Sequence, residues 1–315
     1  MSLNSDYKKL FHEYIQTFHL FHHKDKSEYA NQTHLLVHNI SHFFTIMLTS
    51  QMCIGIFLFN ATPLYNNMSS GVFKDNSLNR TYELSVYVTL PIGDPERDLR
   101  YYVAVMLFDW HISFFCSVTF CMFDLYLSLM IFQIWGHLRI LKHELLVFTK
   151  PKHGQCLYSD VESNLVNLKL KKLVQYHCFI MNFANQVSNT FGAMIFAYYV
   201  FHQVSCCLLL LECSQLDPKA VARYGPLTLI VFQQLMQISI VFELVGSKSE
   251  ELIEATYNLP WQCMDASRRA VVQLLLMRVQ RPLHLKALGM TDVGVRSMAT
   301  IIKTSMSYFT LLRNS

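Results

Sequence analysis

The sequence predicts an all-α, polytopic membrane protein: a helical bundle whose long helices extend into a cytosolic anchor layer. Of its 315 residues, 52% are hydrophobic and only 15% are charged, whereas soluble domains carry roughly 25% charged residues. The apolar residues are concentrated in runs long enough to cross a bilayer. We expect a cytosolic segment (1–34), a transmembrane bundle (35–245), a cytosolic anchor region (246–292) and a last helix with an extracellular C-terminus (293–315).

A spanning helix requires about 20 mostly apolar residues. Four runs in the bundle meet this requirement, at about 35–59, 101–135, 176–211 and 226–245, and a fifth run covers 293–312. As a helix, the second run would be about 52 Å long, against a hydrocarbon core of about 30 Å. We therefore expect its end to project into the cytosol. Pro226 suits the first turn of the fourth helix.

The distribution of basic residues predicts the orientation of the chain. Segments 1–34, 137–175 and 248–292 contain 17 lysines and arginines, whereas the alternate loops at 61–100 and 213–225 contain 6. Because cytosolic loops are enriched in these residues, the N-terminus is expected in the cytosol and the C-terminus outside the cell membrane. Three N-x-[ST] glycosylation acceptors in the first external loop, Asn60, Asn67 and Asn79, agree with this topology.

Charge and motif patterns argue against several functional classes. The basic residues form no stripe of the kind that binds nucleic acid. No CxxC pair occurs among the nine cysteines, which disfavours a zinc site or a redox motif. His38 and His42 share a helix face, but a metal site needs a third ligand, and the glutamate of a zincin motif is missing. We expect neither an enzyme nor a protein with a metal or other cofactor.

An ordered motif begins at residue 246 and continues almost to the end of the chain. It comprises Gly246, Leu252, Ala255, Tyr257, Trp261, Arg268, Arg269, Leu274–Arg278, Gln280–Leu283, Ala287, Gly289, Ile302–Ser305 and Ser307–Leu312. This motif resembles the C-terminal region of insect odorant receptors. The related gustatory receptors typically end in a Thr-Tyr…Gln-Phe pattern, but this chain has Ser307-Tyr308-Phe309-Thr310.

The resemblance implies a seven-helix olfactory receptor subunit with a cytosolic N-terminus. Such subunits form tetramers with the odorant receptor co-receptor, and the resulting nonselective cation channel opens when a volatile ligand binds. The resemblance also implies that this chain lacks the family's first two helices and that residues 1–34 correspond to the cytosolic loop before the third. The alternative is a truncated, non-sensing membrane protein with a structural or regulatory role in receptor assembly.

The last predicted helix carries the candidate pore residues. An apolar constriction in a polar wall can gate a channel by dewetting. The candidates are Thr300, Ile301, Ile302, Thr304 and Ser305; by resemblance, Ile301 aligns with the family's hydrophobic gate. Alternatively, the Ser and Thr side chains mediate helix packing.

A site for an uncharged volatile would be apolar and aromatic with a few polar groups. The candidates on the extracellular halves of the first, second and fourth spans are Thr49, Met52, Ile56, Phe108, His111, Phe114, Phe232, Gln233 and Met236. The alternative is that these side chains only fill the core. A cytosolic helix at about Leu259 to Met277 is predicted to anchor the subunits around the pore, through Tyr257, Trp261, Arg268 and Arg278. Alternatively, this amphipathic helix lies on the membrane surface.

Overall fold

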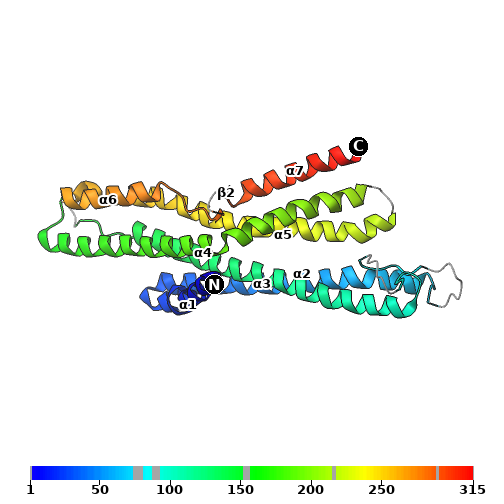
Figure 1. The fold of residues 1–315 in the computed structure, drawn as a ribbon. Coiled ribbons are helices and arrows are strands. Elements are labelled where there is room, and N and C mark those ends of the chain that lie inside the picture. The colour runs from blue at the N-terminus through cyan, green and yellow to red at the C-terminus, as the bar shows by residue number, and fades with distance from the viewer. Residues whose placement is uncertain are drawn as a thin grey trace. The chain divides into compact units, whose positions relative to one another are not determined.

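The computed structural model describes residues 2–73, 81–86, 93–151, 157–214, 218–288 and 291–314. These residues are predominantly helical, which confirms the predicted fold class (Figure 1). The elements are α1 (Ser2–Glu13), the π-helical turn η1 (Tyr14–Phe18), the 3-10 turn η2 (Leu20–Lys26), α2 (Glu28–Ser69), α3 (Leu99–Leu146), α4 (Asp160–Ser214), α5 (Pro218–Tyr257), the 3-10 turn η3 (Trp261–Cys263), α6 (Ala266–Val279), β1 (Lys286–Ala287), β2 (Thr291–Asp292) and α7 (Val295–Asn314).

The helices α2, α3, α4 and α5 contain 42, 48, 55 and 40 residues. Each is long and apolar enough to cross a membrane. They extend beyond the predicted spans at both ends, because helical geometry continues where the hydropathy falls. Among the described residues, α7 does not reach the hydropathy of these four helices, so its membrane span stays a prediction.

Two predicted helix starts were wrong. Pro226 lies inside α5, which already begins at Pro218. The anchor helix begins at Ala266 rather than near Leu259, because Asp265 caps α6: its side chain accepts a hydrogen bond from the backbone N–H of Arg268. The order of the N-terminal segment was not predicted from the sequence: α1, η1 and η2 bring Leu10, Phe18 and Leu20 into the core.

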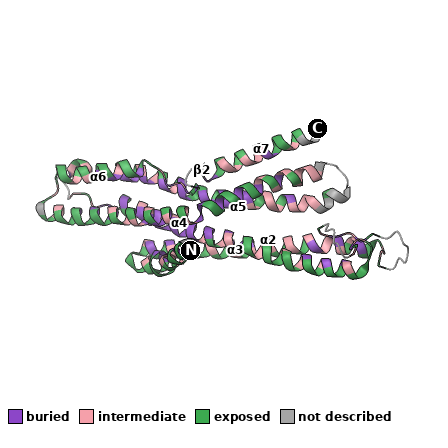
Figure 2. Ribbon diagram, in the orientation of Figure 1, coloured by how far each residue is buried: buried purple, intermediate pink, exposed green. Residues whose placement is uncertain are grey.

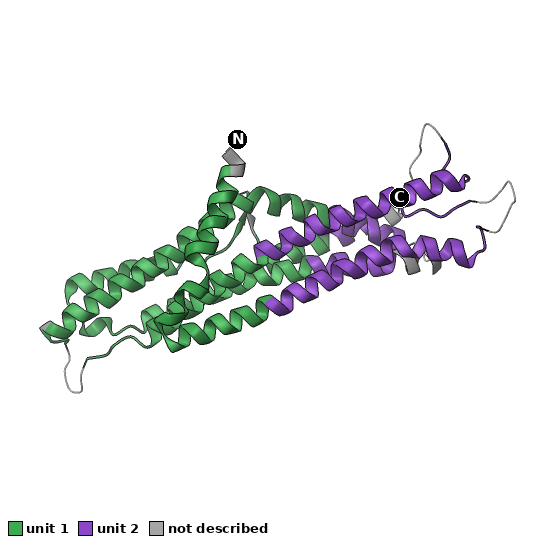
Figure 3. Cartoon of the chain, turned by 90° about the horizontal axis from the view of Figure 1, so that it is seen from below, with its two compact units in different colours: residues 1–41, 128–203, 235–303 green, residues 42–127, 204–234, 304–315 purple. Residues whose placement is uncertain are grey.

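The chain folds as two compact units, which Figure 3 distinguishes by colour. Unit 1 comprises residues 1–41, 128–203 and 235–303, and unit 2 comprises residues 42–127, 204–234 and 304–315. Several of the long helices contribute residues to both units. Each unit has its own buried core.

The core of unit 1 is built around the ring of Phe18. This ring stacks on Phe183 of α4, with centroids 3.6 Å apart and planes inclined by 12°. His137 of α3 is fully buried, and its two nitrogens contact the Phe18 carbonyl oxygen at 2.6 Å and the Tyr176 hydroxyl at 2.7 Å. A Cβ atom at Gly136 would lie 2.5 Å from Leu20 Cδ1 and 2.9 Å from Val37 Cγ2, so a larger residue would require these buried side chains to shift. The N-terminal turns are thereby held against α3 and α4.

In unit 2, Asn67 near the end of α2 joins three segments of the chain. Its side chain accepts a hydrogen bond from the backbone N–H of Glu83 at 2.9 Å and donates to the Glu83 carbonyl at 2.8 Å and the Tyr102 hydroxyl at 3.0 Å. Asn67 and Asn60 are each only 2% exposed. A glycan on either side chain would therefore require this end of α2 to open, and Asn79 lies outside the described residues.

Candidate functional site

The candidate site lies in unit 1, where the β1–β2 hairpin leads into α7. The two strands are antiparallel and pair Lys286 with Asp292. The hairpin docks on α4 through Ser188, whose hydroxyl accepts from the Lys286 N–H at 2.9 Å and contacts the Lys286 carbonyl at 3.2 Å. A Cβ at Gly192 would approach the Leu288 backbone nitrogen to 3.2 Å, so a small residue is needed on α4 here.

The start of α7 is fixed by a carboxylate from α5. An oxygen of Glu243 accepts a hydrogen bond from the backbone N–H of Val295 at 3.2 Å. A Cβ at Gly294 would lie 2.6 Å from the same oxygen, so glycine permits this contact. Because a helix N-terminus carries unpaired N–H groups and a partial positive charge, an anionic side chain stabilises it. Glu243 therefore ties the first turn of α7 to α5.

A cavity of about 330 Å³ lies beside this first part of α7. Its wall consists of Phe196, Tyr199, Val200 and Gln203 from α4, Ala287 and Val293 from the hairpin region, and Ser297, Thr300 and Ile301 from α7. An apolar wall with a few polar groups is typical of small-molecule sites, and the volume lies at the lower end of their range. The cavity is therefore suited to a small, largely apolar molecule.

The polar side of this cavity is fixed by a hydrogen-bonded pair. Tyr199 of α4 and Ser239 of α5 have hydroxyl oxygens 3.0 Å apart. Because the Ser239 hydroxyl donates to the Leu235 carbonyl at 2.7 Å, it accepts from Tyr199. Tyr199 and Gln203 were not predicted as site residues. The sequence feature that could have identified these two residues is that their polar groups interrupt the apolar run 176–211.

The helix α7 buries few of its described side chains. Among its described side chains at 295–311, only Ser305 is buried, and Figure 2 shows the helix as mostly exposed or half-buried. Apolar side chains are exposed along it, including Tyr308 at 56% and Leu311 at 65%. Arg296, Lys303 and Thr310 are exposed on the same helix. Charged side chains are costly against lipid, so this mixed surface suits contact with water or with other protein.

The five predicted pore residues differ in burial. Thr300 and Ile301 line the cavity beside α4. Ile302 and Thr304 are half-buried, and Ser305 is fully buried. Ile301 is also half-buried and borders α4, so its assignment as a gate stays a prediction.

The predicted odorant-binding residues differ in exposure. Phe108 and Phe114 of α3 are 60% and 51% exposed, His111 is exposed between them, and Met236 is 45% exposed. Thr49, Met52 and Ile56 of α2 are half-buried, as is Phe232 of α5. Within unit 2, Gln233 donates to Gln51 of α2 at 3.4 Å, which brings this part of α5 next to the α2 candidates. This odorant site stays a prediction.

The four predicted anchor residues lie on two neighbouring segments. Tyr257 ends α5 and is 60% exposed, and the indole N–H of Trp261 donates to its carbonyl at 3.2 Å. Arg268 pairs with Asp265 at 2.8 Å, whereas Arg278 is exposed. An exposed apolar pair on the same helix, Leu274 (61%) and Met277 (59%), was not among the predicted anchor residues. This pair is spaced i,i+3 and therefore shares one face of α6.

The fold and the helix lengths define a polytopic helical membrane protein. A sequence profile of the 7tm Odorant receptor family matches residues 7–306. The chain therefore belongs to the insect odorant receptor family, as its C-terminal motif predicted.

Two curated relatives illustrate this similarity. Odorant receptor 10 of Aedes albopictus is 23% identical over 48% of this chain and 41% of its own length. Putative odorant receptor 92a of Drosophila melanogaster is 20% identical over 81% of this chain and 59% of its own length. The chain thus matches about half the length of these relatives.

The fold is similar to that of a solved structure, the insect olfactory receptor OR5 from Machilis hrabei. The TM-score is 0.74, with 15% sequence identity, over 90% of this chain and 68% of that one. The same receptor in complex with eugenol matches with a TM-score of 0.74 and 14% identity, over 91% of this chain and 69% of the other. At this identity the similarity demonstrates a shared fold.

Proposed function

We propose that this chain is the ligand-binding subunit of an odorant-gated, nonselective cation channel formed with the odorant receptor co-receptor. The observation that carries the proposal is the surface of α7, which has one buried side chain among those described and exposes charged and apolar groups together. In a membrane, such a helix requires water on one side and protein on another. Copies of α7 around a common axis would supply both.

The ligand in this proposal is a small, uncharged volatile. Membership of the family supports this ligand class, and the receptor of Machilis hrabei that shares the fold has been solved with eugenol. Van der Waals contact with aromatic and aliphatic side chains dominates the binding of such a molecule. We propose the extracellular halves of α2, α3 and α5 as its site, with Met52, Phe108 and Phe232 among the contacts.

Co-expression with the co-receptor tests the whole proposal. We expect a panel of volatile ligands to contain at least one that evokes a cation current only when both chains are present. A complex that co-purifies but conducts no current with any ligand would contradict it. That result would instead support a non-sensing role in receptor assembly.

Ile301 tests the gate within an active channel. Replacing it by serine is expected to raise the resting current, because a polar side chain hydrates a dewetted constriction. Ile301→Leu is the matched control and should preserve the closed state, because it keeps an apolar group of the same size. If Ile301→Ser lowers protein stability without changing the resting current, Ile301 packs in the wall of the cavity beside α7 and is not the gate.

A further inference from the structure

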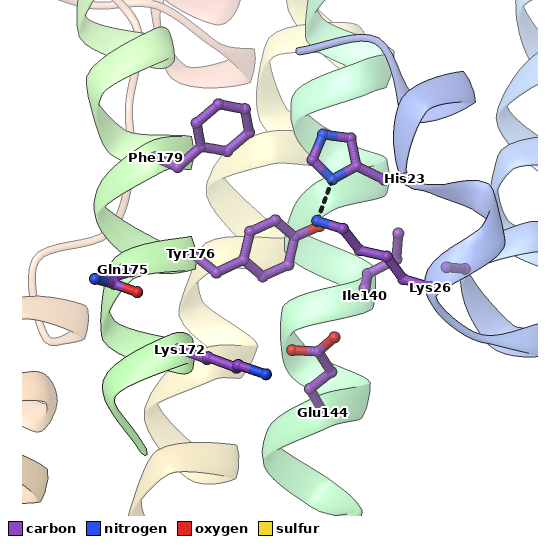
Figure 4. A pocket seen from close by; sticks show the side chains of 9 residues that line it. His23, Lys26, Ile140, Glu144, Lys172, Gln175, Tyr176 and Phe179 are labelled. Atoms are coloured by element: carbon purple, nitrogen blue, oxygen red, sulfur yellow. Dashed lines mark hydrogen bonds between the residues drawn. The ribbon is translucent and has the colours of Figure 1, made fainter. Parts of the chain in front are cut away.

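A second and larger cavity lies in unit 1, among η2, α2, α3 and α4. Its volume is about 630 Å³. The wall consists of His23, Lys26, Ala30, Ile140, Glu144, Lys172, Gln175, Tyr176 and Phe179 (Figure 4). None of these residues belongs to the cavity beside α7 or to the predicted odorant site. The proposed channel function therefore assigns no role to this cavity.

The charged groups of this cavity are arranged at its two ends. Lys26 donates to His23 Nδ1 at 2.8 Å, and His23 Nε2 in turn bonds the Thr17 carbonyl at 3.0 Å. Both ring nitrogens are therefore engaged in the neutral form, and burial, with a smaller contribution from Lys26, lowers the pKa of His23 below its usual value. Among the described residues, His23 is the only hydrogen-bond partner of the Lys26 ammonium, which leaves two of its three donors.

Lys172 and Glu144 mark the other end of the cavity. Figure 4 shows their charged groups turned toward each other. Within the described part of the chain they form no ion pair at 4.0 Å or less, and Lys172 makes no hydrogen bond. The cavity thus presents two ammonium groups and one carboxylate. Its remaining wall is apolar at Ala30, Ile140 and Phe179.

A groove of about 370 Å³ shares Glu144 and Lys172 with this cavity. It adds Lys169 of α4 and Ser27, together with the apolar side chains of Val147 and Phe148. The shared residues make the two spaces neighbours along α4. An elongated molecule with a polar end and an apolar body could extend from one to the other.

The predicted topology places this cavity at the cytosolic edge of the membrane. Tyr176 and Phe179 lie within the predicted span 176–211, and Lys172 precedes it by four residues, or about 6 Å along a helix. Glu144 follows the predicted span 101–135 by nine residues, or about 14 Å, so the cavity extends from the membrane through the head-group layer to its cytosolic side. The head groups occupy the layer between a hydrocarbon core of about 30 Å and a full thickness of about 40–45 Å. The cytosolic leaflet is rich in anionic lipids, which bind basic pockets between transmembrane helices.

We propose that this cavity binds the phosphoserine head group of a cytosolic-leaflet lipid. This head group carries two negative groups and one positive group, which complements two lysines and one glutamate. Lys26 and Lys172 bind its phosphate and carboxylate, and Glu144 accepts its ammonium group. The apolar wall contacts the glycerol backbone. The proposal goes beyond odorant gating and does not depend on it.

Titration of the purified full-length chain in detergent with short-chain lipids tests the proposal. Dioctanoyl phosphatidylserine is expected to bind and to raise the unfolding temperature, whereas dioctanoyl phosphatidylcholine should bind at least about tenfold more weakly. Lys172→Gln is expected to weaken phosphatidylserine binding about tenfold, because one charge-assisted contact is lost. Lys171→Gln is the matched control: the neighbouring lysine is exposed, does not line the cavity, and should leave the affinity unchanged.

Glu144 distinguishes the proposed head group from a simple anion. Glu144→Gln should weaken binding of phosphatidylserine, which has an ammonium group. The same change should strengthen binding of phosphatidylinositol, which has none, because a repulsive charge is removed. Equal effects of Lys171→Gln and Lys172→Gln, or equal affinities for phosphatidylserine and phosphatidylcholine, would overturn the proposal.

Two further measurements complete the test. The first asks whether the head group comes from a membrane lipid or from a soluble compound, and the second asks whether a variant loses binding through a folding defect. Soluble glycerophosphoserine should bind more weakly than the dioctanoyl lipid if the membrane is the source. Equal affinity would overturn the membrane source and assign the cavity to a soluble phosphoserine compound. Lys26→Gln should reproduce the effect of Lys172→Gln, and both variants should unfold at the wild-type temperature without lipid. A variant that has lost binding together with lipid-free stability would count against a direct contact.

Discussion

Helices α4 and α7 differ in where their packing partners lie. Within unit 1, α4 buries side chains every three or four residues, at Val166, Leu170, Leu173, His177 and Ile180, against partners from the same chain. Among the described side chains of α7, only Ser305 is buried. The stability of α4 is therefore internal to the chain. Helix α7 depends on an environment that a single chain does not supply, which is water, lipid or another subunit.

The largest expected effect concerns the core of α4. Phe183→Ala removes a fully buried ring that stacks on Phe18, and should destabilise the chain by about 3–5 kcal/mol through lost burial and a cavity. Thermal unfolding of the detergent-solubilised chain measures this change. Met306→Ala on α7, where the side chain is 44% exposed, should cost less than about 1 kcal/mol in the same assay. Similar losses for both variants would contradict the contrast between the two helices.

The next effect concerns partners outside the chain. Leu274→Asp places a charge on the exposed apolar face of α6, and should weaken the proposed complex with the co-receptor by at least about 2 kcal/mol, or roughly 30-fold. Co-purification from cells that express both chains gives the readout. Gln273→Asp adds the same carboxylate at the adjacent exposed position and should leave the complex intact. A normal yield of complex with Leu274→Asp would argue for an α6 that lies on the membrane surface.

A smaller effect is expected at the start of α7. Glu243→Gln keeps a hydrogen-bond acceptor near the Val295 N–H but removes the negative charge, which should cost about 0.3–1 kcal/mol. Hydrogen exchange at the first turn of α7 should therefore become faster. Glu250→Gln, at an exposed position of α5, serves as the control. If hydrogen exchange at the first turn of α7 is unchanged, this turn is held by the close contact between Glu243 and Gly294, and the negative charge of Glu243 is not needed.

The smallest effect is a pH dependence of the N-terminal turns. Burial, the largest cause in each case, lowers the pKa of His19 and His23 in the folded chain below 6.5. Because the unfolded state then binds protons more readily, their contribution to stability is complete above about pH 6.5 and is lost as the pH falls below it. Limited proteolysis of the N-terminal segment should accelerate on acidification. His23→Asn should reduce this acceleration, whereas His12→Asn on exposed α1 should retain it.

Local patterns were sufficient for much of the fold. Long apolar runs predicted the four spanning helices, and the ordered motif from Gly246 indicated the family. Local patterns failed where a distant residue decides the outcome. Phe18 is held in the core by stacking on Phe183, which lies 165 positions later in the chain. The hydrogen-bond partners of Asn67 come from a loop and from α3. Such pairings leave no periodic signal in a single sequence.

The sequence by itself determined the membrane class, the helical architecture and the family, because hydropathy and motif order are properties of short segments. Only the tertiary structure decided which side chains meet. It joined Glu243 to the start of α7 and enclosed Tyr199 beside Ile301. It also gathered Lys26, Glu144 and Lys172 from three segments around one cavity. The physical reason is that a cavity or a cap depends on how helix faces are oriented and paired in space.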